Sequence, residues 1–258
     1  MFNKHPKGLI AAALANMGER FGFYIMMAIL TLFISAKFGL SETTTGYIYS
    51  AFYASIYILA LAGGVIADKT KNFKGTILVG LILMAIGYLI IAIPTPTPVP
   101  SMALYLGLTC FGLLVIAFGN GLFKGNLQAL VGQMYDDPKY SNLRDAGFQI
   151  FYMFINSGAV FAPFIAIGVR NWWLKVNNFD YDATLPELCH QYLEKGNDMA
   201  PQAMENLTTL AKSVVLDGTP VTDMGMFVNN YLDVFNRGFQ YAFMACLLYT
   251  SPSPRDTR

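Results

Sequence analysis

The sequence predicts an all-α polytopic membrane protein, and two observations lead to this fold class. Hydrophobic residues make up 55% of the 258 residues and charged residues only 13%, about half the charged share of an ordinary soluble domain. The apolar residues also fall in long blocks with few or no charges. Because a bilayer core is crossed by about 20 apolar residues in helical form, each block predicts a membrane-spanning helix.

Five such blocks follow one another along the chain. We expect spans at 8–37, 47–67, 75–94, 101–132 and 145–169. The third and fourth are separated by the proline-rich run 94–100, which cannot be helical because proline lacks the amide donor and clashes with the preceding turn. A soluble bundle of buried helices is the alternative, and five apolar runs of this length exceed what a globular core holds.

The charges in the loops predict the orientation, because cytoplasmic loops are enriched in Lys and Arg. The N-terminal tail and the loops 68–74 and 133–144 carry Lys or Arg, whereas the loops 38–46 and 95–100 carry none. We therefore expect a multi-pass protein of the cell (inner) membrane, with a cytoplasmic N-terminus and the lipid bilayer as a partner. The formal net charge of +1 argues against a nucleic-acid partner, which requires a basic surface.

The order of these blocks divides the chain into segments. Residues 1–169 hold the five spans, and residues 170–235 form an insertion that the alternation of loops places outside the cytoplasm. The insertion begins with a Trp172–Trp173 pair suited to a membrane interface, and it contains helix-like stretches at Leu185–Lys195 and Pro201–Leu216.

The end of the sequence has a different character. Residues 236–245 begin a sixth apolar span, which then gives way to a Ser/Pro-rich tail. The run Cys246–Asp256 matches the translation of a transposon-based sequencing adapter, so we interpret 246–258 as an artefact and set it aside from the fold. On this interpretation the native chain is interrupted near Ala245, within its sixth span.

Polar residues inside the first span mark a candidate site, since such groups are costly in hydrocarbon and usually functional. Asn16, Arg20 and Tyr24 follow one another at intervals of four residues, so they form one stripe of a helix with Glu19 beside it. The pattern favours a cavity that binds a charged solute and moves protons. The alternative is an ion pair that locks two helices together.

Two further candidate sites lie in the fourth and fifth spans. Lys124 follows glycines that permit close helix approach, and its ammonium group could be neutralised by Glu19 or by a solute carboxylate; snorkelling to the membrane interface is the alternative. In the fifth span, Tyr152 and Asn156 are again four residues apart. An Asn amide can both donate to and accept from a peptide bond, and a helix–helix hydrogen bond is its alternative role.

At these residues the chain resembles the proton-dependent oligopeptide transporter family of the major facilitator superfamily. Four motifs carry the resemblance, in the order in which they occur along the chain. The first span contains E-R-F-x-[FY]-Y at Glu19, Arg20, Phe21, Phe23 and Tyr24, and the second ends with G-G-x-x-A-D at Gly63–Asp68. Lys124 matches the lysine of the fourth helix, and the fifth span contains F-Y-x-x-I-N-x-G at Phe151, Tyr152, Ile155, Asn156 and Gly158. The resemblance implies the N-terminal six-helix bundle of a major facilitator fold, truncated in its sixth helix.

The resemblance also implies residue roles and an activity. Bound peptide would be contacted by Arg20, Tyr24, Lys124 and Asn156. Proton and peptide movement would be coupled by Glu19, Arg20 and Lys124. Asp68 would belong to a gating loop. The implied activity is proton-coupled symport of di- and tripeptides, driven by the proton gradient without a cofactor. The partners implied are small peptides and a missing C-terminal half, without which we expect this chain to be inactive.

Three positions depart from the family pattern and leave alternatives open. Asn16 replaces a glutamate, Met27 stands where many members have a basic residue, and Gly125 stands where proline is usual. A secondary transporter of another small solute, such as an amino-acid conjugate or an organic anion, is therefore the first alternative. A membrane-embedded enzyme would need a nucleophile–base pair or metal cluster, but His5 and His190 lie outside the spans, so we expect no catalytic or metal site. A non-transporting receptor is supported only by the insertion.

Overall fold

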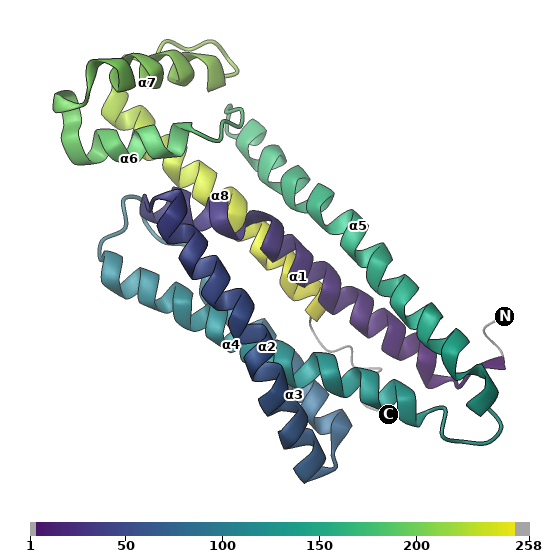
Figure 1. Ribbon diagram of the computed structural model, residues 1–258. Coiled ribbons are helices and arrows are strands. Elements are labelled where there is room, and N and C mark those ends of the chain that lie inside the picture. The colour runs from purple at the N-terminus through teal and green to yellow at the C-terminus, as the bar shows by residue number, and fades with distance from the viewer. Residues whose placement is uncertain (1–3, 251–258) are drawn as a thin grey trace.

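The computed structural model describes residues 4–250, with side-chain surroundings through residue 246 (Figure 1). Its five long helices are α1 (Gly8–Phe38), α2 (Glu42–Thr70), α3 (Phe73–Ala92), α4 (Met102–Gln133) and α5 (Arg144–Val176). All five are long and apolar enough to cross a membrane, which confirms the predicted all-α membrane fold. The proline-rich run lies between α3 and α4, outside both helices.

The remaining helices cover one end of the long ones and then return beside them (Figure 1). They are α6 (Leu185–Lys195), α7 (Pro201–Val214) and α8 (Met224–Thr250), with short 3-10 turns η2 (Ser141–Leu143) before α5 and η3 (Gly196–Asp198) after α6. The predicted helical stretches of the insertion therefore correspond to α6 and α7.

The insertion is shorter in the structure than the expected 170–235, because the flanking helices extend into it. α5 continues through the tryptophan pair to Val176, and α8 begins at Met224 rather than near residue 236. The first turns of α8 carry polar residues such as Asn229 and Asp233, so hydropathy alone did not show that they are helical. Of the segment interpreted as an adapter artefact, residues 251–258 lie outside the described residues.

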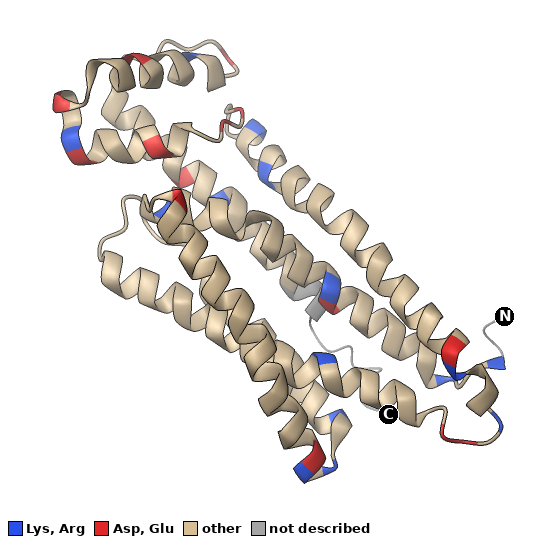
Figure 2. Ribbon diagram, in the orientation of Figure 1, with Lys and Arg blue, Asp and Glu red and all other residues tan. Residues whose placement is uncertain are grey.

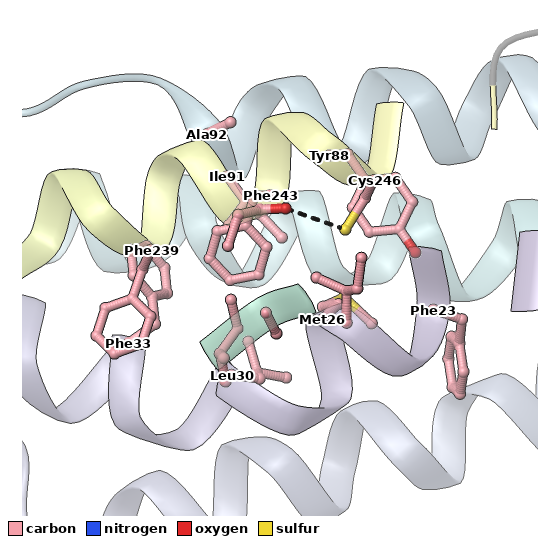
Figure 3. Packing of buried hydrophobic residues seen from close by; sticks show 14 of the residues in the cluster. Phe23, Met26, Leu30, Phe33, Tyr88, Ile91, Ala92, Phe239, Phe243 and Cys246 are labelled. Atoms are coloured by element: carbon pink, nitrogen blue, oxygen red, sulfur yellow. Dashed lines mark hydrogen bonds between the residues drawn. The ribbon is translucent and has the colours of Figure 1, made fainter. Parts of the chain in front are cut away.

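α1 is the central helix of the arrangement. It packs against α5 and α8, while α4 packs against α2 and α3, and α3 also contacts α8. Figure 3 shows aromatic and aliphatic side chains of α1, α3 and α8 meeting at one level, among them Phe33, Ile91 and Phe243. The rings of Phe33 and Phe243 meet edge to face with centroids 4.9 Å apart, an arrangement that aromatic pairs prefer.

Glycines bring α4 unusually close to its two neighbours. A Cβ atom added at Gly121 would lie 2.6 Å from the carbonyl oxygen of Leu59 in α2, and one added at Gly119 would lie 2.6 Å from that of Gly80 in α3. Neither neighbour is a flexible side-chain end, so the backbones themselves set the spacing. Small residues at such crossings let membrane helices pack backbone to backbone, and they fix the position of α4 relative to α2.

We expect Gly121→Ala to destabilise the protein by about 1–3 kcal/mol, because the added methyl group must displace the α2 backbone. Gly125→Ala is the matched control on the same helix, since a Cβ there meets nothing within 4 Å. That control should be neutral or slightly stabilising, because alanine is the better helix former. Thermal unfolding of both variants in detergent checks the prediction, and an equal response of the two would contradict it.

Candidate functional site

The centre of the site is an ion pair buried inside α1. Glu19 is 0% exposed and Arg20 is 6% exposed. The Arg20 guanidinium donates from Nε to Glu19 Oε2 at 2.5 Å and from Nη2 to Glu19 Oε1 at 2.6 Å. Its Cζ atom also lies 4.7 Å from the ring centroid of Phe23. Figure 2 shows a band of charge partway along α1, whereas most other charged residues lie near helix ends or in the outer helices.

Asn120 of α4 connects this ion pair to a second helix. Its Nδ2 donates to Glu19 Oε1 at 2.7 Å, and its side chain is fully buried. The hydrogen bonds from Arg20 and Asn120 to Glu19 are all made to a carboxylate, and hydrogen bonds to an ionised group are stronger than those between neutral groups. The polar face predicted for the first span therefore contacts α4 at Asn120. The sequence motif around Lys124 contained Asn120, but nothing in the spacing identified it as the partner of Glu19.

A pocket of about 290 Å³ opens beside the ion pair, between α1, α2 and α4. Its lining residues are Arg20, Phe23, Tyr24, Met27, Tyr49, Tyr53, Ile56, Tyr57 and Lys124. Lys124 follows Asn120 by one turn of α4 and is half-buried. Its Nζ lies 5.4 Å from the ring centroid of Tyr57, a distance at which cation and ring attract each other. Three residues predicted to act together, Arg20, Tyr24 and Lys124, thus share one pocket.

Three tyrosines of α2 form the wall of the pocket opposite α1. Tyr49 and Tyr53 have nearly parallel rings with centroids 6.3 Å apart, and the hydroxyls of Tyr53 and Tyr57 are 3.0 Å apart. Sequence reasoning missed these residues. Their spacing of four residues along a predicted helix was the available signal, since it places all three on one face.

The other predicted site residues lie outside this pocket. Asn156 and Tyr152 line a separate groove on α5. Asn156 nevertheless lies at the level of the ion pair, because a Cβ atom added at nearby Gly158 would lie 2.9 Å from the carbonyl oxygen of Met17 in α1. Asp68 is exposed at the end of α2, and Asn16 is buried but does not line the pocket.

The charges leave the pocket with one positive group. Glu19 and Arg20 neutralise each other, and among the described residues Lys124 belongs to no ion pair. The structure therefore pairs Glu19 with Arg20 rather than with Lys124, which resolves one alternative left open by the sequence. A partly buried ammonium group without a counterion favours an anionic ligand such as a carboxylate. Within residues 4–246 no cluster of His, Cys, Asp or Glu could hold a metal ion.

Known proteins share these helices. The profile of the POT family matches residues 74–182, which include Lys124 and Asn156. Dipeptide and tripeptide permease A of Cronobacter turicensis is 34% identical over 161 residues, covering 62% of this chain and 30% of the relative. The chain is therefore similar to the POT family over these residues. Dipeptide and tripeptide permease B of Xenorhabdus bovienii is 36% identical over 167 residues.

Solved POT structures resemble the fold. A mutant of peptide transporter POT in complex with sulfate is 34% identical, with a TM-score of 0.57 over 64% of this chain and 32% of that one. A POT family transporter in complex with 5-aminolevulinic acid is 25% identical, with a TM-score of 0.59 over 97% of this chain and 38% of that one. The chain spans about a third of the length of the curated relatives it matches.

We expect Glu19→Gln to lower the free energy of unfolding by about 3 kcal/mol, because it leaves the Arg20 guanidinium buried without an anion. Asp233→Asn is the control: its ion pair with Arg237 on α8 is 2.7 Å long but half-exposed, and exposed pairs contribute less than about 1 kcal/mol. Unfolding in denaturant measures both changes. If the two losses were equal, the ion pair in α1 would not be the buried interaction described above.

Proposed function

We propose that this chain provides the solute-binding half of a proton-coupled symporter of di- and tripeptides in the inner membrane. The observation that carries the proposal is the pocket that joins an uncompensated Lys124 to a wall of tyrosines beside a buried carboxylate. The names of the relatives, which are dipeptide and tripeptide permeases, support peptides as the solute. The energy source proposed is the proton gradient, without a cofactor.

Peptide binding is proposed to begin at Lys124. The ammonium group suits the carboxylate of a short peptide, and Tyr24 and the α2 tyrosines offer ring faces and hydroxyls to its side chains and amide groups. At about 290 Å³ the pocket lies just below the usual range of small-molecule sites, about 300–1,000 Å³, so the longer peptides would extend beyond it. The groove at Asn156, on the other side of the same α1 segment, is proposed to contact the remaining part.

Proton coupling is proposed to act through Glu19. Protonation of its carboxyl group would remove the charge that holds the Arg20 guanidinium. The peptide carboxylate bound at Lys124 could then also bind Arg20, which lines the same pocket. Peptide and proton would in this way favour each other's binding, as coupled transport requires. Asp68, at the exposed end of α2, is proposed to act in the gating loop rather than in binding.

The proposed working unit includes further helices. POT relatives are about three times as long as the matched part, and large apolar side chains on α2 and α5, such as Leu61 and Phe164, are exposed. We propose that a C-terminal half completes the pocket and alternates access by rocking against this half. The N-terminus is proposed to be cytoplasmic and α6–α7 extracytoplasmic, and the chain by itself is proposed not to transport.

Transport of another small solute is the second candidate, and Met27 favours it. Met27 lines the pocket where many family members have a basic residue, so the site offers one cation fewer to a peptide. One solved POT family transporter is in complex with 5-aminolevulinic acid, an amino-carboxylate that is not a peptide, and this supports the second candidate. A competition panel of dipeptides and amino-carboxylates against the same uptake separates the two candidates.

We expect Lys124→Ala and Glu19→Gln in the full-length parent to abolish dipeptide accumulation in proteoliposomes under an inward proton gradient. Glu19→Gln should retain exchange of dipeptide across the membrane, because it removes the titrating group but not Lys124. Lys139→Ala, in the exposed loop between α4 and α5, is the control and should accumulate normally. Accumulation by both site variants would refute the assigned roles, and saturable uptake by the present chain would refute its inactivity.

A further inference from the structure

A second and larger cavity lies between the α1–α2 connection and α6, away from the pocket described above. Its volume is about 790 Å³. Three carboxylates line it, Glu42 from α2 and Glu187 and Glu194 from α6. No Lys or Arg is among its lining residues, and none of the three carboxylates forms an ion pair within the described part of the chain. The cavity is therefore strongly acidic.

A buried hydroxyl in the same cavity lacks a partner. Thr45 lines the cavity from α2 and is 2% exposed. Its Oγ1 has no hydrogen-bond partner among residues 4–246, although an unsatisfied buried polar group costs about 1–3 kcal/mol. This orphaned hydroxyl, which can donate or accept a hydrogen bond, is independent of the acidic cluster, and it indicates that a polar group of a ligand completes the site.

His190 of α6 fixes the walls of the cavity to each other. Its Nε2–H donates to the carbonyl oxygen of Ala36 at 2.7 Å, since that oxygen can only accept. The ring also lies against Gly39, whose φ of 64° and closeness to the imidazole leave no room for a side chain. Burial lowers the pKa of His190, so the ring is neutral at neutral pH and adds no positive charge beside Glu42, Glu187 and Glu194.

These features identify the class of ligand. A divalent metal requires clustered oxygen ligands, and among the described residues no group of acidic side chains lies close enough to hold one. Three carboxylates, which can only accept, suit a larger cation with several N–H donors. The ring of Phe235, which also lines the cavity, can attract the same cation, and the orphaned hydroxyl can accept one of its hydrogen bonds. We propose that this cavity binds a small organic cation through its primary ammonium group.

Phenylalaninamide tests the proposal, because it carries an ammonium group and an aromatic ring. Binding to the detergent-solubilised chain is measured by calorimetry below the pKa of the amine, with N-acetylphenylalaninamide as the uncharged match. We expect the amine to bind and the acetylated compound not to bind. Glu187→Gln and Glu194→Gln should each weaken binding about two- to fivefold, the range for partly exposed charge pairs.

Matched variants separate this site from general charge effects and from the proposed peptide pocket. Glu205→Gln removes a carboxylate of α7 that does not line the cavity and should leave the affinity unchanged. Thr45→Val keeps the shape without the hydroxyl, so it should weaken binding without lowering thermal stability. Lys124→Ala should not change amine binding, whatever its effect on peptides. Equal binding of the acetylated compound, or equal loss in Glu205→Gln and Glu187→Gln, would overturn the proposal.

Discussion

The buried carboxylate of Glu19 is the group on which the rest of the structure depends. A charge inside a membrane helix is tolerated only with partners, and Glu19 has two: the guanidinium of Arg20 and the amide of Asn120. The first partner neutralises its charge, and the second links α1 to α4. Because α4 is in turn held against α2 and α3 by glycine contacts, the carboxylate of Glu19 links α1 to the group of helices formed by α2, α3 and α4.

The pocket follows from that arrangement. With Arg20 occupied by Glu19, Lys124 is the free cation of the pocket, and the α2 tyrosines complete the wall facing it. The same two features that stabilise the fold, a paired charge and a close helix crossing, therefore also prepare a site for an anionic solute. Similarity to the POT family gives this geometry a context, since the relatives it matches are named dipeptide and tripeptide permeases.

Much of the fold was predictable because apolar blocks of this length report on a bilayer directly. The five spans and both outer helices agree with the structure, whereas the start of α8 was missed because its first turns are amphipathic. For the site, periodicity placed Asn16, Arg20 and Tyr24 on one stripe, and in the structure Arg20 and Tyr24 line the pocket together with Lys124 whereas Asn16 does not. Periodicity could not identify Asn120 or the separate groove of Asn156. Spacing shows which side chains share a face of one helix, but the packing of the helices decides which side chains of two helices meet.

Lys124 lies in a solute-accessible pocket beside the buried ion pair of Glu19 and Arg20. Cysteine accessibility tests it most directly, in a background in which Cys110, Cys189 and Cys246 are replaced by serine. Lys124→Cys and Tyr57→Cys should react with a charged, water-soluble methanethiosulfonate reagent, whereas Met84→Cys, which is fully buried near Asn120, should not. An unreactive Lys124→Cys alongside a reactive Met84→Cys would contradict the account.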